Sequence, residues 1–434
     1  MLARAARRLL PASSLLAAAL PLRRTYSSKV HGIFINYVDH GRPHLFARPT
    51  SSRTVDAMLD FLPDDDRLRF WWSVLDHSGG LLLCDMTVEL CVCNPATRRW
   101  TLIPRLQRQR QGKSGVYLAF DPAASPHYEL IVVPAAPPGM DKPPFVDDDT
   151  SRRLLESEWP PTPWTLDVFS SRTGQWEERA FVRQGEPAGT VRSLRLHQAD
   201  PICWGCQRYG VFSRGTLYVH CRGSFVLRLS LSNGAYQVIS APTYNESTRY
   251  VKPYLGRSQN MVYFGIVEVP ERLRIWILDE SSGRMEWILK YQDDLVPLAQ
   301  HLTKYNRYDR PMDAPWIVHD VFNAEEDASA ETLTKKRFEW DSDDDGFFTI
   351  KRGPKVYYKH FDILGFHPYK EVVYLTDVFG VVAYHLTNSK VQYLGKSRPR
   401  SYYQAYTNNI EESFVYTPCL LGELNEENTD ENSS

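Results

Sequence analysis

The fold is decided by a stretch that reads Trp164-Thr-Leu-Asp-Val-Phe-Ser-Ser-Arg-Thr-Gly-Gln-Trp176. Apolar and polar residues alternate at its start, which is typical of a half-buried β-strand. Ser and Gly follow, and they favour a tight turn because they hydrogen-bond their own main chain or tolerate a left-handed backbone. Trp176 then begins a second strand. The stretch therefore predicts a β-hairpin with an aromatic residue on its returning strand.

The same pattern recurs along the chain. The further copies span residues 90–100, 227–236, 275–287 and, in a weaker form, 382–393. Additional apolar strands are expected at residues 80–84, 215–221, 260–265 and 371–375, and another hairpin from residues 116–121 and 128–133. A strand followed by a hairpin, repeated at roughly 45–50 residues, indicates the blades of a β-propeller.

The aromatic residues that follow the turns are unevenly spaced, at Trp100, Trp176, Tyr236, Trp287 and Tyr393. The two wide gaps each leave room for a degenerate blade or for an insertion. We expect an all-β fold in which one β-propeller-like domain has about six blades, with five or seven as alternatives. Aromatic residues make up 12% of the chain, which also favours strands.

Four segments stand outside this pattern. The propeller-like domain is expected to span residues 29–421, after a leader at residues 1–28. Residues 134–163 are rich in Pro and Asp, and residues 323–346 are acidic, so both are expected to be loop insertions. Residues 422–434 form an acidic tail with too few apolar residues to bury, and we expect this tail to be disordered.

The leader at residues 1–28 is rich in Arg, Ala, Leu and Ser and contains no acid. Arg-rich, acid-poor amphipathic segments are what organellar import receptors recognise. Arg24, Tyr26 and Ser27 resemble a mitochondrial processing site, and we expect cleavage after Tyr26. A secretory signal fits less well, because Arg23 and Arg24 stand where small uncharged residues are expected. These residues predict a mitochondrial protein, with plastid import or a cytoplasmic or nuclear location without import as the alternatives.

Composition excludes several classes of protein. The formal charge is −1 for the chain and −6 once the five arginines of residues 1–26 are set aside. A mildly acidic body argues against nucleic-acid binding, which normally goes with a basic excess. Seven Cys, an odd number in a long chain, do not suggest a disulfide-stapled secreted scaffold. No stretch reaches the ~20 apolar residues of a membrane-spanning helix, so no membrane span is expected.

Several segments resemble the F-box-associated propeller region of plant F-box proteins, in particular its large grass-expanded branch. The segments that carry the resemblance are residues 70–84, 93–100, 176–189, 215–223 and 285–290. The resemblance covers roughly residues 30 to 420 and implies a propeller that binds proteins. Members of the family commonly carry a helical F-box before the propeller. Here the import-like leader occupies that place, which leaves membership of a ubiquitin ligase open.

Two clusters have residue types that could bind a metal ion. Asp341, Asp343 and Asp345 alternate as in a calcium loop, but position 12, where an EF-hand has Glu, is Arg352. A solvated acidic loop is the simpler interpretation. Cys203 and Cys206 have the spacing of half a zinc site, but no second pair of this spacing follows. We therefore interpret them as structural thiols and expect no bound metal.

No linear motif for catalysis or for a cofactor is found, whether a phosphate loop, GxGxxG, GxSxG or HExxH. We expect no catalytic residues, no cofactor and no enzymatic activity. The expected function is a protein-binding scaffold whose unknown protein partner contacts the propeller loops. One alternative is a substrate-recognition subunit for ubiquitin ligation in the cytosol or nucleus. The other is an enzyme or metal protein that uses the Cys203–Cys206 pair or the Asp341 cluster.

Overall fold

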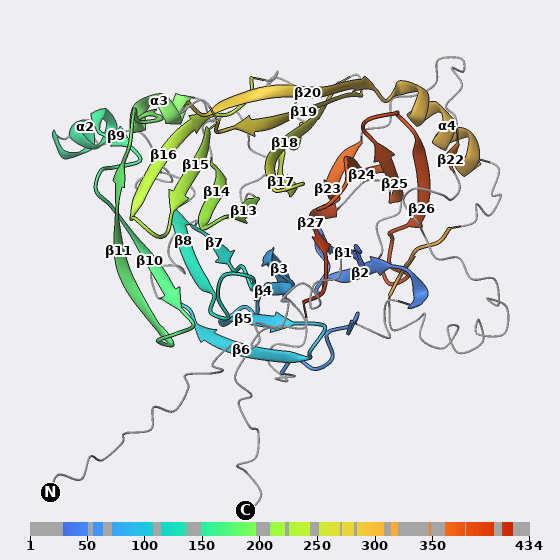
Figure 1. Ribbon diagram of the computed structural model, residues 1–434, viewed down its shortest axis with the longest axis horizontal. Coiled ribbons are helices and arrows are strands. Elements are labelled where there is room, and N and C mark those ends of the chain that lie inside the picture. Colours follow the sequence, from blue (N-terminus) through green and yellow to red (C-terminus); the bar gives the residue numbers. More distant parts are fainter. Residues whose placement is uncertain are drawn as a thin grey trace, which may run out of the picture.

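Six blades of antiparallel strands surround a central axis in the computed structural model (Figure 1). Two neighbouring blades join into one eight-stranded sheet through a short parallel pairing of residues 182–183 with residues 235–236. The structure describes residues 29–50, 55–63, 72–106, 114–134, 137, 149–196, 209–221, 225–243, 251–269, 271–281, 284–307, 314–319, 347–348, 361–377, 379–402 and 410–419. The fold is an all-β propeller with six blades, which confirms the blade number that the repeats predict.

Five blades follow the chain in order. Blade 2 holds β3 (Ser73–Ser78), β4 (Leu81–Asp85), β5 (Glu89–Asn94) and β6 (Arg99–Pro104). Blade 3 holds β7 (Ser114–Ala119), β8 (Glu129–Pro134), β10 (Trp164–Ser170) and β11 (Gln175–Arg183). Blade 4 holds β13 (Gly210–Ser213), β14 (Thr216–Cys221), β15 (Phe225–Ser230) and β16 (Ala235–Ser240). Blade 5 holds β17 (Tyr254–Ser258), β18 (Met261–Glu268), β19 (Arg272–Asp279) and β20 (Glu286–Asp294). Blade 6 holds β23 (Asp362–Phe366), β24 (Val372–Asp377), β25 (Gly380–His385) and β26 (Val391–Lys396), with β22 (Phe347–Phe348) at its edge.

Blade 1 is assembled from three separate parts of the chain. Its innermost strand is β27 (Ile410–Tyr416), from the C-terminal end of the described chain. Next to it lie β1 (Gly32–Tyr37) and β2 (His44–Ala47), from the N-terminal end. The outermost strand is β21 (Ile317–Val318), which belongs to the segment between blades 5 and 6. Blade 1 therefore closes the ring by pairing strands that are far apart in sequence.

The repeated hairpin of the sequence is the third and fourth strand of a blade, and each copy occupies one of blades 2 to 6. In three of these turns the fifth residue donates its N–H to the carbonyl of the first. The bonds are Arg98 to Asn94 at 2.8 Å, Gly174 to Ser170 at 2.9 Å and Ser389 to His385 at 2.8 Å. The donor residue has positive φ in each, with values of 58°, 69° and 54°. A residue that tolerates the left-handed region is thus what each turn requires.

In the described parts of both wide gaps between the aromatic residues, the structure shows insertions and no further blade. The first contains α2 (Asp149–Glu156) and β9 (Glu158–Trp159) between β8 and β10. β12 (Gly189–Thr190), which pairs with β9, and α3 (Val191–Leu196) follow β11. The second contains α4 (Val296–Arg307) and β21 between blades 5 and 6. The expected insertion at residues 323–346 and the tail at residues 422–434 lie outside the described residues.

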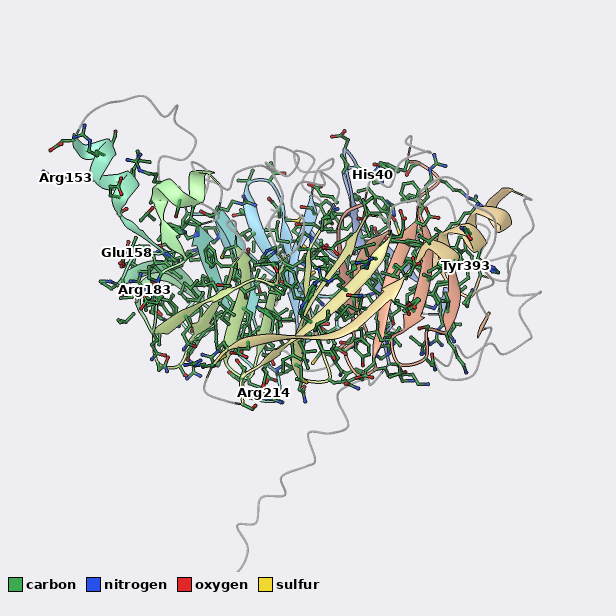
Figure 2. All side chains as sticks on the ribbon, turned by 90° about the horizontal axis from the view of Figure 1, so that it is seen from above. His40, Arg153, Glu158, Arg183, Arg214 and Tyr393 are labelled. Carbon is green, nitrogen blue, oxygen red and sulfur yellow. The ribbon has the colours of Figure 1, made fainter. Side chains whose placement is uncertain are left out.

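The two faces of the ring differ. Figure 2 shows His40 and Arg153, with α2 and α3, on one face and Arg214 on the opposite face. We call the first the insertion face. The second, the turn face, carries the short turns that follow the innermost strands, such as Gly79–Gly80, Arg214–Gly215 and Gln259–Asn260. No helix in the described part of the chain is long and apolar enough to cross a membrane.

The core consists of a buried apolar cluster between each pair of neighbouring blades. Strand β1 shows why, because successive side chains of a strand point to opposite faces of its sheet. Ile33 and Ile35 pack toward blade 6, whereas Phe34 packs toward blade 2. All six residues of β1 are buried. A strand buried on both faces is what a closed ring of stacked sheets requires.

Candidate functional site

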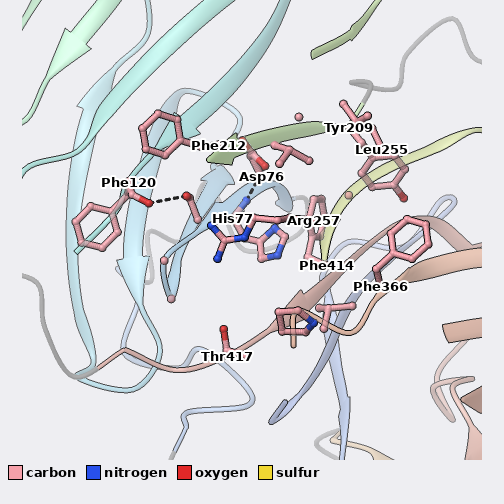
Figure 3. Close-up of a pocket in the computed structure, with 18 of the residues that line it drawn as sticks. Asp76, His77, Phe120, Tyr209, Phe212, Leu255, Arg257, Phe366, Phe414 and Thr417 are labelled. Atoms are coloured by element: carbon pink, nitrogen blue, oxygen red, sulfur yellow. Dashed lines mark hydrogen bonds between the residues drawn. The ribbon is translucent and has the colours of Figure 1, made fainter. Parts of the chain in front are cut away.

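A narrow channel lies on the axis of the propeller (Figure 3). The innermost strands β27, β3, β7, β13, β17 and β23 contact one another in a ring around this axis. Residues on or beside each of these strands line the channel, which has a volume of about 120 Å³. The site therefore depends on all six blades rather than on any continuous segment.

Two basic side chains face each other in the channel, Arg257 of β17 and His77 of β3 (Figure 3). The pKa of His77 is lowered to about 4, mainly by burial and in part by the charge of Arg257. A hydrogen bond to the Val415 carbonyl acts in the opposite direction. The Nδ1 atom of His77 is buried and has no hydrogen-bond partner among the described residues. His77 is therefore held as a neutral imidazole beside a permanent positive charge.

Arg257 has an exposed side chain within this channel. Other arginines of the described chain form ion pairs, including Arg179 with Glu129 at 2.8 Å and Arg274 with Glu268 at 3.2 Å. Within the described ranges, no carboxylate lies within ion-pair distance of Arg257. Its charge is therefore directed at the solvent or at a ligand in the channel.

Two buried carboxyl groups, Asp76 and Glu412, connect blades to one another beside the channel. Asp76 accepts the backbone N–H of Leu118 at 2.8 Å, which joins β3 to β7, and also accepts the N–H of His77 at 2.8 Å. Burial raises the pKa of Asp76 to about 7, although both hydrogen bonds oppose this shift. A carboxyl group with this pKa is about half protonated near neutral pH, so it offsets less of the charge of Arg257 than a fully ionised carboxylate would.

Glu412 of β27 is the second buried carboxyl group. It accepts the Nδ2 hydrogen of Asn36 at 3.1 Å, and Asn36 also pairs with the backbone of Val74 in β3. Burial, together with the nearby charge of Glu411, raises the pKa of Glu412 well above its usual range. This shift favours the protonated form of Glu412, which joins blade 1 to blade 2 through Asn36.

Four aromatic rings form one wall of the channel, and one of them, Phe414, contacts the His77 ring at 5.6 Å. Tyr209 and Tyr254 lie with ring centroids 4.1 Å apart, and Phe366 and Phe414 flank them at 5.8 and 6.2 Å. The Tyr254 hydroxyl donates to the Ser413 carbonyl at 3.1 Å, and the Ser413 N–H donates to the Tyr209 hydroxyl at 3.2 Å. These hydrogen bonds fix the rings in place, so the wall is rigid as well as apolar.

The channel opens at the turn face, near the end of β27. Tyr369, with 40% of its surface exposed, and Thr417 line this mouth. Gly79 and Gly80 form its β3–β4 turn with φ of 55° and 89°. A Cβ atom at Gly80 would lie 2.5 Å from the Cβ atom of Cys419, so glycine is required for the close approach as well as for the turn.

The structure does not place the residues that were singled out from sequence. Arg24, Tyr26 and Ser27 of the processing site, Cys203 and Cys206, and Asp341, Asp343 and Asp345 all lie outside the described residues. Of the described residues, no group of three His, Cys, Asp or Glu side chains could hold a metal ion. Sequence reasoning singled out neither His77 nor Arg257. No linear signal identifies this pair, because its members come from blades 2 and 5.

Comparison with known proteins gives one informative sequence match. An F-box protein of Arabidopsis thaliana is 24% identical over 236 residues, which cover 52% of this chain and 49% of that protein. This similarity, although weak, supports an F-box-associated family. The chain spans about half the length of the relative that it matches. No family model matches the chain.

Solved structures with similar folds are only loosely superposable. The WD40 domain of SCAP from fission yeast has a TM-score of 0.29 at 11% identity, covering 76% of this chain and 55% of that one. Sqt1 of Saccharomyces cerevisiae has a TM-score of 0.28 at 9% identity, covering 89% of each chain. AztD of Citrobacter koseri has a TM-score of 0.31 at 10% identity, covering 82% and 76%. Superpositions of this quality carry no argument about fold or function.

Proposed function

We propose that this F-box-associated propeller is a non-enzymatic scaffold that binds a protein partner at the turn face, around the mouth of the channel. The observation that carries the proposal is the combination of Arg257, whose charge has no carboxylate beside it in the described chain, with the exposed ring of Tyr369. Arginine and tyrosine are the residue types that dominate the energy of protein interfaces. The closed ring supports both on a rigid frame, as binding sites generally require.

The proposal is tested by recovering partners of the tagged full-length chain from its source cells under mild cross-linking. Two charge-reversal variants form a matched pair: Arg257→Glu at the channel mouth and Arg153→Glu on the insertion face. We expect the first to lose its specific partners and the second to keep them, with thermal unfolding of both close to that of the wild type. Equal recovery by both variants would show that the turn face is not the docking surface.

We further propose that the protein acts in mitochondria and belongs to the grass-expanded branch of the F-box-associated family. The support is the Arg-rich leader with Arg24, Tyr26 and Ser27, which stands before the propeller. A fusion of residues 1–35 to a fluorescent protein should enter mitochondria, and the mature chain should begin near Ser27. A diffuse signal with Met1 intact would contradict this location.

A role as substrate receptor of a ubiquitin ligase is the second candidate, favoured by the similarity to the Arabidopsis F-box protein. It requires that the chain bind the scaffold of the ligase in the cytosol or nucleus. Quantitative mass spectrometry of the same pull-down distinguishes the candidates. Stoichiometric recovery of ligase scaffold subunits would support this role, and their absence alongside mitochondrial partners would support the first.

A further inference from the structure

The mouth of the channel presents two groups that can each hydrogen-bond an oxygen atom. Arg257 offers a planar fork of N–H donors without a carboxylate beside it in the described ranges. His77 offers a buried Nδ1 atom for which the structure provides no partner. A buried polar atom left without a hydrogen bond is unfavourable, so an atom of this kind beside an unpaired cation indicates a ligand.

Space in the channel limits the size of such a ligand. One ordered water needs roughly 10–15 Å³ of free volume, and the channel has about 120 Å³. A group of a few non-hydrogen atoms therefore fits, whereas a folded element does not. The aromatic wall of Tyr209 and Tyr254 bounds the space on one side.

The charges around the channel favour an anion as the ligand. Asp76 and Glu412 are the buried carboxyl groups near the channel, and burial raises the pKa of both. Asp121 also lines the mouth, where its Oδ1 atom accepts the N–H of Ala123 at 3.0 Å, and it lies outside ion-pair distance of Arg257. An anion beside Arg257 forms hydrogen bonds that are stronger than neutral ones.

We propose that the channel mouth is a binding site for a single oxyanion group, a carboxylate or a phosphate, held by Arg257 and His77. Arg257 pairs with two oxygens of the group, which is the geometry that its guanidinium favours. One proton lies between Nδ1 of His77 and an oxygen of the group, supplied either by the acid form of the ligand or by protonation of the imidazole. In a phosphate this is a third oxygen, and in a carboxylate it is one of the two oxygens that Arg257 also contacts. Both basic residues are then satisfied, and the anion lies against the aromatic wall.

Two sources can provide such a group: a free small anion, or an acidic side chain or chain end of the protein partner. Only the second source rests on the proposed function. Isothermal titration of the full-length chain with sodium phosphate, with sodium acetate and with a short Glu-rich peptide separates them, at constant ionic strength because salt screens such contacts. Tighter binding of the peptide than of acetate at equal carboxylate concentration indicates a partner segment. Binding of phosphate or acetate without this gain indicates a free anion.

The variants that test the site are Arg257→Gln and His77→Gln, with Arg214→Gln, on the turn face outside the channel, as the matched control. We expect saturable binding by the wild type and by the control, and a loss of about tenfold or more with Arg257→Gln, as for a lost charge-assisted bond. A smaller loss is expected with His77→Gln. Absence of saturable binding to any probe, or equal affinity of wild type and Arg257→Gln, would overturn the proposal.

The outcomes also separate the anion site from the proposed docking surface. Anion binding that depends on Arg257, combined with unchanged partner recovery by Arg257→Glu, would leave the anion site standing and refute the docking surface. Loss of partners by Arg257→Glu without any anion binding would refute the anion site and leave the docking surface standing.

Discussion

Blades 1 and 5 have the same four-stranded form but are built in different ways. Blade 5 is one continuous meander from Tyr254 to Asp294, so each strand pairs with its neighbour in sequence. Blade 1 takes its strands from residues 32–47, 317–318 and 410–416. The comparison shows that a propeller can make five blades from local hairpins and still depend on one non-local blade for closure.

The exposure of the two blades differs as well. Every residue of β1 and β2 is buried, whereas β20 at the edge of blade 5 has Ile288 and Leu289 exposed at 46% and 44%. Since burial of apolar area is the main stabilising term, the closure blade contributes more stability per residue than the edge of blade 5. Substitutions matched between the two blades test this difference.

The largest effect on stability is expected from Trp316→Ala, for which Trp287→Ala is the matched substitution. Trp316 precedes β21, is 1% exposed and packs on Phe46 of blade 1 at 5.4 Å. Trp287 is only partly buried, against Phe264 in blade 5. We expect the free energy of unfolding to fall by about 3–5 kcal/mol with Trp316→Ala and by about 1–2 kcal/mol with Trp287→Ala. Urea denaturation measures both, and equal losses would remove the distinction between the blades.

The second comparison uses buried carboxyl groups, Glu412 in blade 1 and Glu271 in blade 5. Burial raises the pKa of Glu271 to about 7, with help from the charge of Asp294, and raises that of Glu412 well above its usual range. In both cases the folded state holds the proton more tightly than the unfolded state. Stability therefore falls as pH rises from about 4.5 through the folded pKa.

Replacement by Gln removes this dependence, so each variant should gain stability relative to the wild type as pH increases. For Glu271→Gln the gain should be complete near pH 7 and amount to at most about 3 kcal/mol, reduced by any solvent screening. For Glu412→Gln the gain should have the same sign, because the pKa of Glu412 is raised in the folded state. Denaturation at pH 5, 7 and 9 measures the difference. A wild-type curve parallel to that of Glu412→Gln would mean that Glu412 ionises normally.

The third comparison uses two glycines, Gly365 and Gly174. A Cβ atom at Gly365, in β23, would lie 2.4 Å from Cγ2 of Val415 in the closure strand β27, and φ is +148°. At Gly174 nothing lies within 4 Å, although φ is +69°. The free energy of unfolding should fall by roughly 2–4 kcal/mol with Gly365→Ala and by about 1 kcal/mol with Gly174→Ala. Thermal unfolding measures both changes. Equal losses of stability would show that the junction between blades 6 and 1 can shift to accommodate the added methyl group.

The smallest effect is expected on the exposed edge of blade 5. Ile288→Ala removes a side chain that is 46% exposed, so stability should change by no more than about 0.5 kcal/mol. Urea denaturation measures this change. A loss above about 1 kcal/mol would indicate that β20 is covered by another part of the chain.

Sequence reasoning predicted the local part of this architecture, the hairpins within each blade. The hairpin around Trp164–Trp176 and its copies was predictable because strand alternation and turn chemistry both lie within a dozen residues. It could not place β21 in blade 1, because two residues carry no periodicity. It could not combine His77 with Arg257 either, since the closure of the ring brings them together and neither belongs to a motif.

The central claim is that blade 1 closes the ring and makes it one cooperative unit, with the channel walls held in place as a result. Native-state hydrogen exchange tests it most directly, because it gives an opening free energy for each amide. The account predicts that amides of β1 and β27 open with the same free energy as those of β18 and β19, equal to global unfolding. If β1 and β27 exchange through a lower-energy opening while blade 5 stays protected, the ring opens at blade 1, and the claim is contradicted.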